Sequence, residues 1–127
     1  MTSCNAKKPF PYYILTEDKE VQQVDFETYA AWENAGGVRA RCVRRTEVGD
    51  AYVSTVFLMI DHRFGDAGPP VVFETMVFGG AYDQHQDRYT TYYDAVYGHQ
   101  QVVNRVLESQ AWLTRIVFKI RRALSRV

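Results

Sequence analysis

The sequence is poor in cysteine and has no net charge. Its two cysteines, Cys4 and Cys42, form no disulfide framework and match no zinc-binding spacing. Because 15 basic and 15 acidic residues balance each other, no strong overall field draws the chain to nucleic acid or to a membrane. The low cysteine content favours a reducing, intracellular setting.

Long hydrophobic runs and targeting signals are also missing. The longest apolar run, residues 53–60, contains Ser54 and Thr55 and is far too short to span a bilayer. The first residues lack the apolar core of a signal peptide, and Thr2 does not fit the N-myristoylation pattern. We therefore expect a cytoplasmic protein.

The familiar catalytic spacings are absent as well. No serine lies in a GxSxG motif, Gly79-Gly80 lacks the frame of a phosphate-binding loop, and neither HExxH nor paired cysteines mark a metal site. Neighbouring arginines could lower the pKa of Cys42, but a cysteine at an inward strand position more often acts as a small apolar residue. The sequence favours a non-enzymatic protein with no cofactor and no metal.

Two β-rich apolar runs dominate the middle of the chain. Residues 51–60 and 71–78 flank a polar connection that is rich in glycine and proline. This pattern predicts a central β-hairpin over about residues 51–79. Both faces of each run are mainly apolar, so we expect the two strands to be covered on both sides.

The N-terminal half predicts shorter elements around this hairpin. Residues 12–15 form a short β-rich run, and residues 16–23 are turn-like. Asp25 can cap a helix over about residues 26–34, which Gly36-Gly37 would end. Residues 38–48 alternate small apolar side chains, Cys42 among them, with arginines, as in a half-exposed strand.

The C-terminal part predicts a loop and then helix. Residues 81–90 are polar and loop-like, and Thr91 with Asp94 is typical of a helix N-terminus. The helix is expected to reach about residue 109. A second helical segment over about residues 111–125 continues it or follows a bend.

This order of elements is typical of an α+β domain. It predicts a small antiparallel sheet of three to four strands. The sheet packs against an N-terminal helix and a long or bent C-terminal helical region. At 127 residues the chain is expected to form one domain, with residues 1–11 as a flexible tail.

Polar side chains near the hairpin are the first candidates for a ligand or partner site. They are Asp61, His62, Arg63, Glu74, Arg88 and His99. In a structural interpretation, His62 is a turn residue bonded to local backbone, in a turn that Asp61 holds as a hydrogen-bond acceptor. Glu74 then pairs with a cross-strand arginine, Arg63 or Arg88. In the alternative, Asp61, His62, Glu74 and Arg88 line the pocket of a small-ligand-binding or enzymatic domain.

Residues 111–126 form the second candidate, a basic amphipathic helix. Its candidate partner-binding residues are Trp112, Arg115, Lys119, Arg122 and Arg126. Such a helix can pack on the core with a solvated basic face, or bind a protein partner or a second copy. It can also face a membrane surface or nucleic acid, the outcome that the sequence favours least.

Several short strings carry a resemblance to a known group of proteins. They are RTEVG at 45–49, STVFL at 54–58, DHRFG at 61–65, FETMVFGG at 73–80, RYTT at 88–91 and GH at 98–99. Over about residues 44–100 the chain resembles small proteins encoded in phage and prophage genomes. The resemblance implies a mobile-element setting and a non-secreted product, and it assigns no catalytic residue.

These features lead to one main prediction and two alternatives. The chain is predicted to be a phage-type accessory protein that acts without catalysis by binding a macromolecular partner, with a host factor as one candidate. The first alternative is the small-ligand-binding or enzymatic domain described above. The second is a structural homo-oligomer that associates through residues 112–124.

Overall fold

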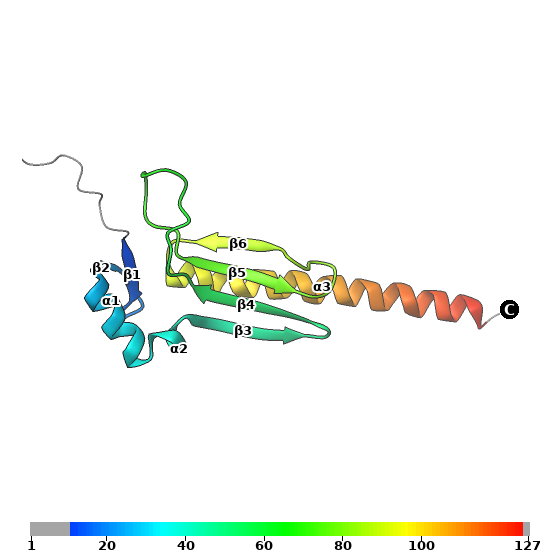
Figure 1. Cartoon of the computed structure of the whole chain (residues 1–127). Coiled ribbons are helices and arrows are strands. Elements are labelled where there is room, and N and C mark those ends of the chain that lie inside the picture. The colour runs from blue at the N-terminus through cyan, green and yellow to red at the C-terminus, as the bar shows by residue number, and fades with distance from the viewer. Residues whose placement is uncertain (1–10, 126–127) are drawn as a thin grey trace, which may run out of the picture.

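The computed structural model describes residues 11–125, apart from the side chain of Val38. These residues form two antiparallel sheets, short helices near the N-terminus and one long C-terminal helix (Figure 1). The α+β class predicted from the sequence is confirmed. Arg126, Cys4 and nearly all of the predicted tail lie outside the described residues.

The larger sheet has four antiparallel strands in chain order. They are β3 (Cys42–Val48), β4 (Ala51–Phe57), β5 (Phe73–Phe78) and β6 (Gln86–Tyr89). The predicted hairpin is formed by β4 and β5, with Val53 opposite Val77. The prediction of a loop over residues 81–90 is wrong in part, because β6 pairs with β5 despite its polar composition.

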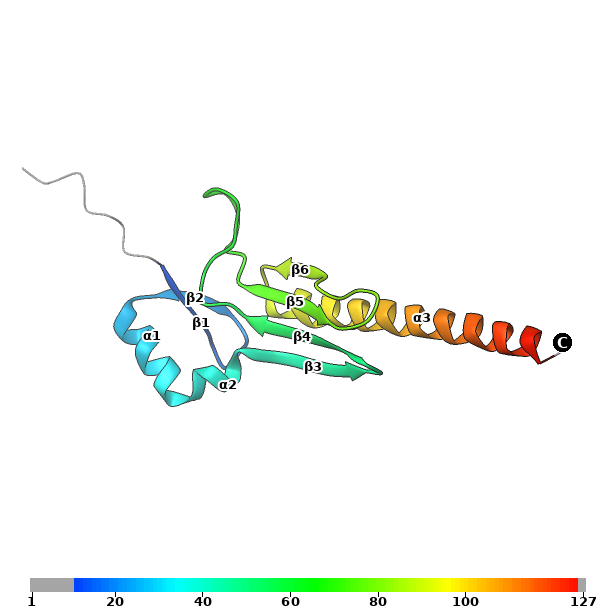
Figure 2. The same ribbon diagram turned by 45° about the vertical axis from the view of Figure 1, so that its right-hand side comes forward.

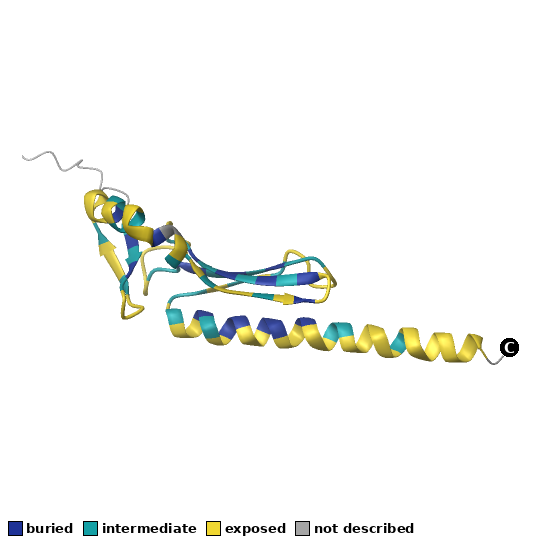
Figure 3. Cartoon of the chain, turned by 90° about the horizontal axis from the view of Figure 1, so that it is seen from below, coloured by how far each residue is buried: buried dark blue, intermediate teal, exposed yellow. Residues whose placement is uncertain are grey.

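Helix α3 (Tyr92–Leu124) covers one face of this sheet (Figure 3). The burial of β4 alternates, so Val53 and Thr55 are fully buried whereas Tyr52 is partly exposed. The prediction that both faces are covered is therefore wrong. On the open face, Tyr52 stacks on Phe78 with ring centroids 4.8 Å apart, and the Arg45 guanidinium lies 4.2 Å from the Tyr52 centroid. These neighbours shield one another on a face that no second layer of the described residues covers.

The buried apolar side chains form two clusters. One contains Val48, Ala51, Val53, Val77, Val102, Val103 and Val106. The other contains Tyr13, Leu15, Phe57, Val72, Phe73 and Ala95. Each fully buried valine or phenylalanine contributes about 1.5–3 kcal/mol to folding, so these side chains fix α3 on the sheet.

A small N-terminal unit packs at one end of the larger sheet (Figure 2). Its strands β1 (Tyr12–Leu15) and β2 (Val21–Val24) pair antiparallel, so the prediction of a turn over residues 16–23 is wrong at its C-terminal end. Helix α1 (Phe26–Trp32) begins at Asp25, whose side chain accepts a hydrogen bond of 2.8 Å from the Thr28 N–H, which confirms the predicted cap. The Trp32 Nε1–H donates to the Leu15 carbonyl over 3.1 Å and ties α1 to β1.

The connection between α1 and β3 differs from its prediction. Gly36, with φ of 108°, breaks the helix, but helical segments η1 (Glu33–Gly37) and α2 (Val38–Ala40) carry the chain on to Arg41. The strand consequently begins at Cys42 and not at Val38. A bulge between Cys42 and Arg44 shifts the alternation of side chains, so Cys42 is exposed and not inward-facing.

Helix α3 is continuous over 33 residues, or about 50 Å. It begins as predicted, since the Thr91 hydroxyl accepts a hydrogen bond of 3.1 Å from the Asp94 N–H. Near its middle, Gln110 Nε2 donates to the Val48 carbonyl over 2.6 Å at the end of β3. Residues 111–124, here named the projecting segment, extend beyond the ends of the strands (Figures 1 and 2).

Candidate functional site

The structure divides the predicted site residues among three places. Asp61, His62 and Arg63 lie in the loop between β4 and β5, residues 58–72. Glu74 and Arg88 lie on the open face of the sheet, and His99 is buried under the opposite face. These residues therefore do not converge on one pocket in the described structure, as the ligand-binding alternative requires.

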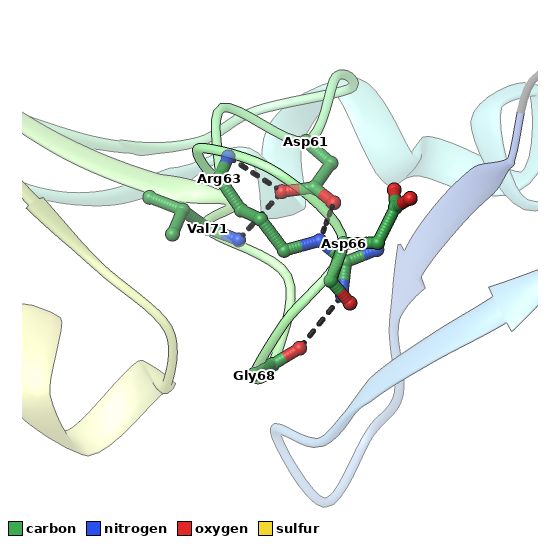
Figure 4. A network of polar contacts seen from close by, with 5 residues as sticks. All are labelled: Asp61, Arg63, Asp66, Gly68 and Val71. Carbon is green, nitrogen blue, oxygen red and sulfur yellow. Dashed lines mark hydrogen bonds and ion pairs between the residues drawn. The ribbon is translucent and has the colours of Figure 1, made fainter.

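Asp61 organises the loop between β4 and β5 (Figure 4). Its Oδ1 accepts hydrogen bonds of 2.8 Å from the backbone N–H groups of Arg63 and Val71. Its Oδ2 forms an ion pair of 2.8 Å with Arg63 Nε, and Arg63 Nη1 donates to the Gly68 carbonyl over 2.6 Å. The predicted turn held by Asp61 is confirmed, and the side chain of His62 is exposed.

The carboxylate of Asp61 is kept ionised by these contacts. Burial alone would raise its pKa, but the hydrogen bonds from Arg63 and Val71 and the Arg63 charge together lower it. Asp61 and Arg63 also line a cavity of about 490 Å³ beside Tyr12, Met59 and Ile60. Because the two charges are paired with each other, Asp61 has no ionised oxygen left without a partner that could act as a catalytic base.

Glu74 and Arg88 form a cross-strand ion pair on the open face. Glu74 Oε2 lies 3.1 Å from Arg88 Nε, and the two residues are directly opposite in the register of β5 and β6. The prediction that Glu74 pairs with an arginine is confirmed, with Arg88 as the partner. The pairing neutralises the one acidic side chain in the apolar run of β5.

His99 is fully buried and both of its ring nitrogens have partners. Nδ1 lies 2.7 Å from the Thr55 hydroxyl, and Nε2 lies 2.8 Å from the Thr46 hydroxyl. Thr55 in turn lies 2.6 Å from the Thr75 hydroxyl. Burial, helped by the nearby Arg44 charge, lowers the pKa of His99. This network is a satisfied polar core that joins α3 to three strands.

The sequence analysis missed this network because it considered His99 as a ligand or partner residue. The available signal was a threonine at the centre of each apolar strand, Thr55 in β4 and Thr75 in β5. A hydroxyl in such a position requires a partner when it is buried. These threonines, with Thr46 and His99, come from four of the strings that carry the resemblance, so those strings meet at the interface between α3 and the sheet.

The projecting segment contains the largest group of exposed apolar side chains in the described residues. They are Trp112, Leu113, Val117, Phe118, Ile120 and Leu124, each between 47% and 69% exposed. Arg115, Lys119 and Arg122 are exposed as well, and the segment contains no acidic residue. The alternative in which residues 111–126 pack on the core is therefore wrong for residues 111–124.

The described residues contain neither a metal-binding cluster nor a helix that could span a membrane. Among residues 11–125, no group of three or more histidine, cysteine, aspartate and glutamate side chains has an arrangement that could hold a metal ion. Within the same residues, no helix has both the length and the apolar character that crossing a membrane requires. The surfaces of the sheet and of α3 remain as the features from which a function can be inferred.

No protein family, curated protein or solved structure matches this chain. The α+β fold class is established by the structure, in which a helix covers one face of a four-stranded sheet. The resemblance to phage-encoded proteins stays a prediction. Function has to be inferred from the chain's own surfaces.

Proposed function

We propose that this chain is a non-catalytic binding protein that engages a macromolecular partner through the projecting segment of α3. The observation that carries the proposal is the exposure of six large apolar side chains where α3 extends beyond the sheet, four of which, Leu113, Val117, Ile120 and Leu124, share one side of the helix. Contiguous apolar patches of more than a few hundred Å² are rare on monomeric proteins and mark contact sites. A helix of this kind can present such side chains to a partner as anchors.

The basic residues of the segment add a second property. Arg115, Lys119 and Arg122 follow one another at helical spacing on one side of α3. A concentrated charge of one sign accelerates encounter with an oppositely charged surface and disfavours wrong partners. The segment thus combines apolar anchors with a charged flank, as partner-binding surfaces commonly do.

The polar residues near the hairpin support binding over catalysis. Asp61 is paired with Arg63, Glu74 with Arg88, and His99 with two threonines. A catalytic acid, base or nucleophile has to reach a substrate, usually in a cleft where several such groups converge. In the described residues Asp61 and Glu74 are each paired with an arginine, and the buried His99 is bonded to threonines.

The resemblance to phage and prophage proteins supplies the setting of this proposal. It implies a mobile-element setting inside a host cell, and the proposed partner is encoded by the phage or by its host. The proposal is that the chain works there as an accessory protein. The chemistry of the projecting segment favours a protein as the partner, because its apolar stripe needs an apolar surface to cover it.

Photo-crosslinking in living host cells tests the proposal. In the probe variant, benzoylphenylalanine replaces Val117 of the projecting segment in the full chain. In the control variant it replaces Gln101, which is exposed on the half of α3 that the sheet covers. Irradiation is expected to give adducts heavier than the chain from position 117 and far fewer from position 101.

The identity of the adduct then separates the outcomes. A defined protein adduct from position 117, whether with another protein or with the chain itself, supports the proposal. Absence of any adduct from position 117, and from probes at positions 113 and 120, overturns it. Equal adducts from positions 101 and 117 also overturn it, because the contact would not be specific to the projecting segment.

A further inference from the structure

We infer that the partner on the projecting segment is a second copy of this chain, packed antiparallel to the first. This inference rests on the proposed function, since it names the molecule that the segment binds. It follows from three features of α3: where its apolar stripe points, how the stripe residues are spaced, and where the charges lie.

The apolar stripe of the projecting segment continues the stripe that holds α3 on the sheet. Spacings of four and three residues alternate from one end to the other. The stripe residues are His99, Val103, Val106, Gln110, Leu113, Val117, Ile120 and Leu124. The first three are buried under the sheet and the fourth bonds the end of β3. A helix with this repeat keeps these positions on one side, with a drift of about 20° per heptad, so Leu113 to Leu124 face the layer that the sheet occupies.

This placement leaves a stretch of the stripe uncovered by the described residues beyond the sheet, here named the notch. The sheet ends at the turn of Gly49 and Asp50, and beyond it the stripe has no cover among the described residues (Figure 3). The sheet lies on the same side of α3 as the stripe. A flat surface such as a bilayer would therefore touch the end of the sheet before it could contact the whole stripe. A helix fits, because packed helices lie about 8–10 Å apart, and the segment offers 14 residues, or about 21 Å, for contact.

The spacing of the stripe reads the same in both directions. Leu113, Val117, Ile120 and Leu124 are separated by four, three and four residues. In an antiparallel pair, Leu113 therefore lies opposite Leu124 of the second copy, and Val117 lies opposite Ile120. Such a contact is self-complementary about a two-fold axis and closes at two copies. Each copy's segment would fill the notch of the other, next to its sheet.

The charges are compatible with this pair. Arg115, Lys119 and Arg122 lie on the side of α3 away from the stripe, and Arg121 lies at its flank. Two copies therefore bring positive charges near one another without burying them. Added salt screens the repulsion between these positive charges, so a higher salt concentration is expected to strengthen the pair. Binding to an anionic lipid or nucleic acid would instead weaken with salt.

A matched pair of variants tests which side of the segment makes the contact. Val117 and Phe118 are adjacent and are 48% and 64% exposed, but only Val117 lies on the stripe. Val117→Asp and Phe118→Asp each remove one apolar side chain and add one negative charge. Analytical ultracentrifugation of the full chain at about 100 μM, a hundredfold above a Kd of about 1 μM, measures the mass.

The wild-type chain is expected to sediment at twice 14.7 kDa. Val117→Asp is expected to weaken association at least about a thousandfold, to a Kd of about 1 mM, so that most chains sediment singly, whereas Phe118→Asp stays paired. A wild-type chain that is monomeric at this concentration overturns the inference. Equal loss of pairing in both variants also overturns it, because the stripe would not be the specific contact. Circular dichroism of both variants checks that α3 is retained.

Disulfide trapping tests the direction of the pair. In a chain with Cys4→Ser and Cys42→Ser, one preparation carries Leu113→Cys and another carries Leu124→Cys. Mild oxidation of the mixture is expected to link one chain of each kind, since these positions are opposite in the antiparallel pair. Rapid linkage within the Leu124→Cys preparation alone indicates parallel helices and overturns the inference.

Failure here is distinguishable from failure of the proposed function. If the chain is monomeric but position 117 crosslinks to a different protein, the second copy is excluded and the binding function stands. If the monomeric chain binds vesicles of anionic lipid through both Val117 and Phe118, a membrane is the occupant and the inference is overturned. If position 117 crosslinks to nothing, both proposals fail.

Discussion

The ring of Tyr89 in β6 lies directly against the backbone of Gly98 in α3. A Cβ added at Gly98 would overlap the ring carbons and the hydroxyl oxygen of Tyr89. Glycine is therefore required at this position by the close approach of a strand side chain to the helix, although it weakens the helix itself. The contact sets how closely α3 can approach β6.

Gly98→Ala is expected to lower the free energy of unfolding. The added methyl group forces Tyr89 or α3 to move, and overpacking of this kind costs about 1–3 kcal/mol. This loss opposes the gain of about 1 kcal/mol that alanine has over glycine within a helix. Urea denaturation of the two chains measures the difference. The double variant Tyr89→Val and Gly98→Ala makes room for the methyl group, so Gly98→Ala should be less costly in that background; an equal cost would contradict the contact.

Sequence patterns were sufficient where local chemistry decides the structure. The hairpin of β4 and β5, the Asp25 and Thr91 caps, and the pairing of Glu74 with an arginine all follow from alternation or from local hydrogen bonding. They depend on neighbours in the chain or on adjacent strands. Such features are specified within a few residues.

The features that could not be predicted depend on tertiary partners that no local sequence pattern identifies. Strands β2 and β6 are polar, and only their pairing with β1 and β5 makes them strands. In the sequence alone, His99 has the character of a ligand-binding residue. Only the fold shows that Thr46 and Thr55 are its hydrogen-bond partners. The open face of the sheet could not be inferred from its apolar composition, because Tyr52 and Phe78 shield each other by stacking.

The buried His99 predicts a loss of stability in mild acid. Burial and the Arg44 charge lower its pKa in the folded state below the unfolded value of about 6.5. Between these two pKa values the unfolded chain binds a proton that the folded chain does not, so stability falls as the pH drops. The contribution is fully present above pH of about 6.5. Denaturation midpoints measured between neutral and mildly acidic pH are expected to decrease through this window.

The variant His99→Gln removes the titrating group and serves as the control for this pH dependence. It is expected to be less stable at neutral pH, because glutamine does not reproduce both hydrogen bonds to Thr55 and Thr46. Its stability should, however, depend less on pH over the same window than that of the wild-type chain. An unchanged slope would assign the pH dependence to other groups.

Asp61 is predicted to hold the loop between β4 and β5 closed. Asp61→Ala removes two hydrogen bonds to backbone N–H groups and the ion pair with Arg63. Each lost hydrogen bond costs about 1 kcal/mol, and the freed loop should be cut faster by trypsin after Arg63. Asp66→Ala is the matched control, because its carboxylate has no hydrogen bond or ion pair in the described structure. Equal cleavage of both variants would show that Asp61 does not organise the loop.

The Glu74–Arg88 pair is predicted to contribute little to stability by itself. Arg88 is 43% exposed at its side chain, and exposed ion pairs contribute about 0–1 kcal/mol. Glu74 is only 16% exposed, so Arg88→Ala leaves a partly buried carboxylate without its partner and should cost more than Glu74→Gln. Replacing both residues by valine should recover the loss, because a cross-strand apolar pair fits the partly covered face. Urea denaturation of the wild-type chain, Glu74→Gln, Arg88→Ala and the double valine variant measures these effects. A double variant that remains as unstable as Arg88→Ala would show that this face requires the charged pair.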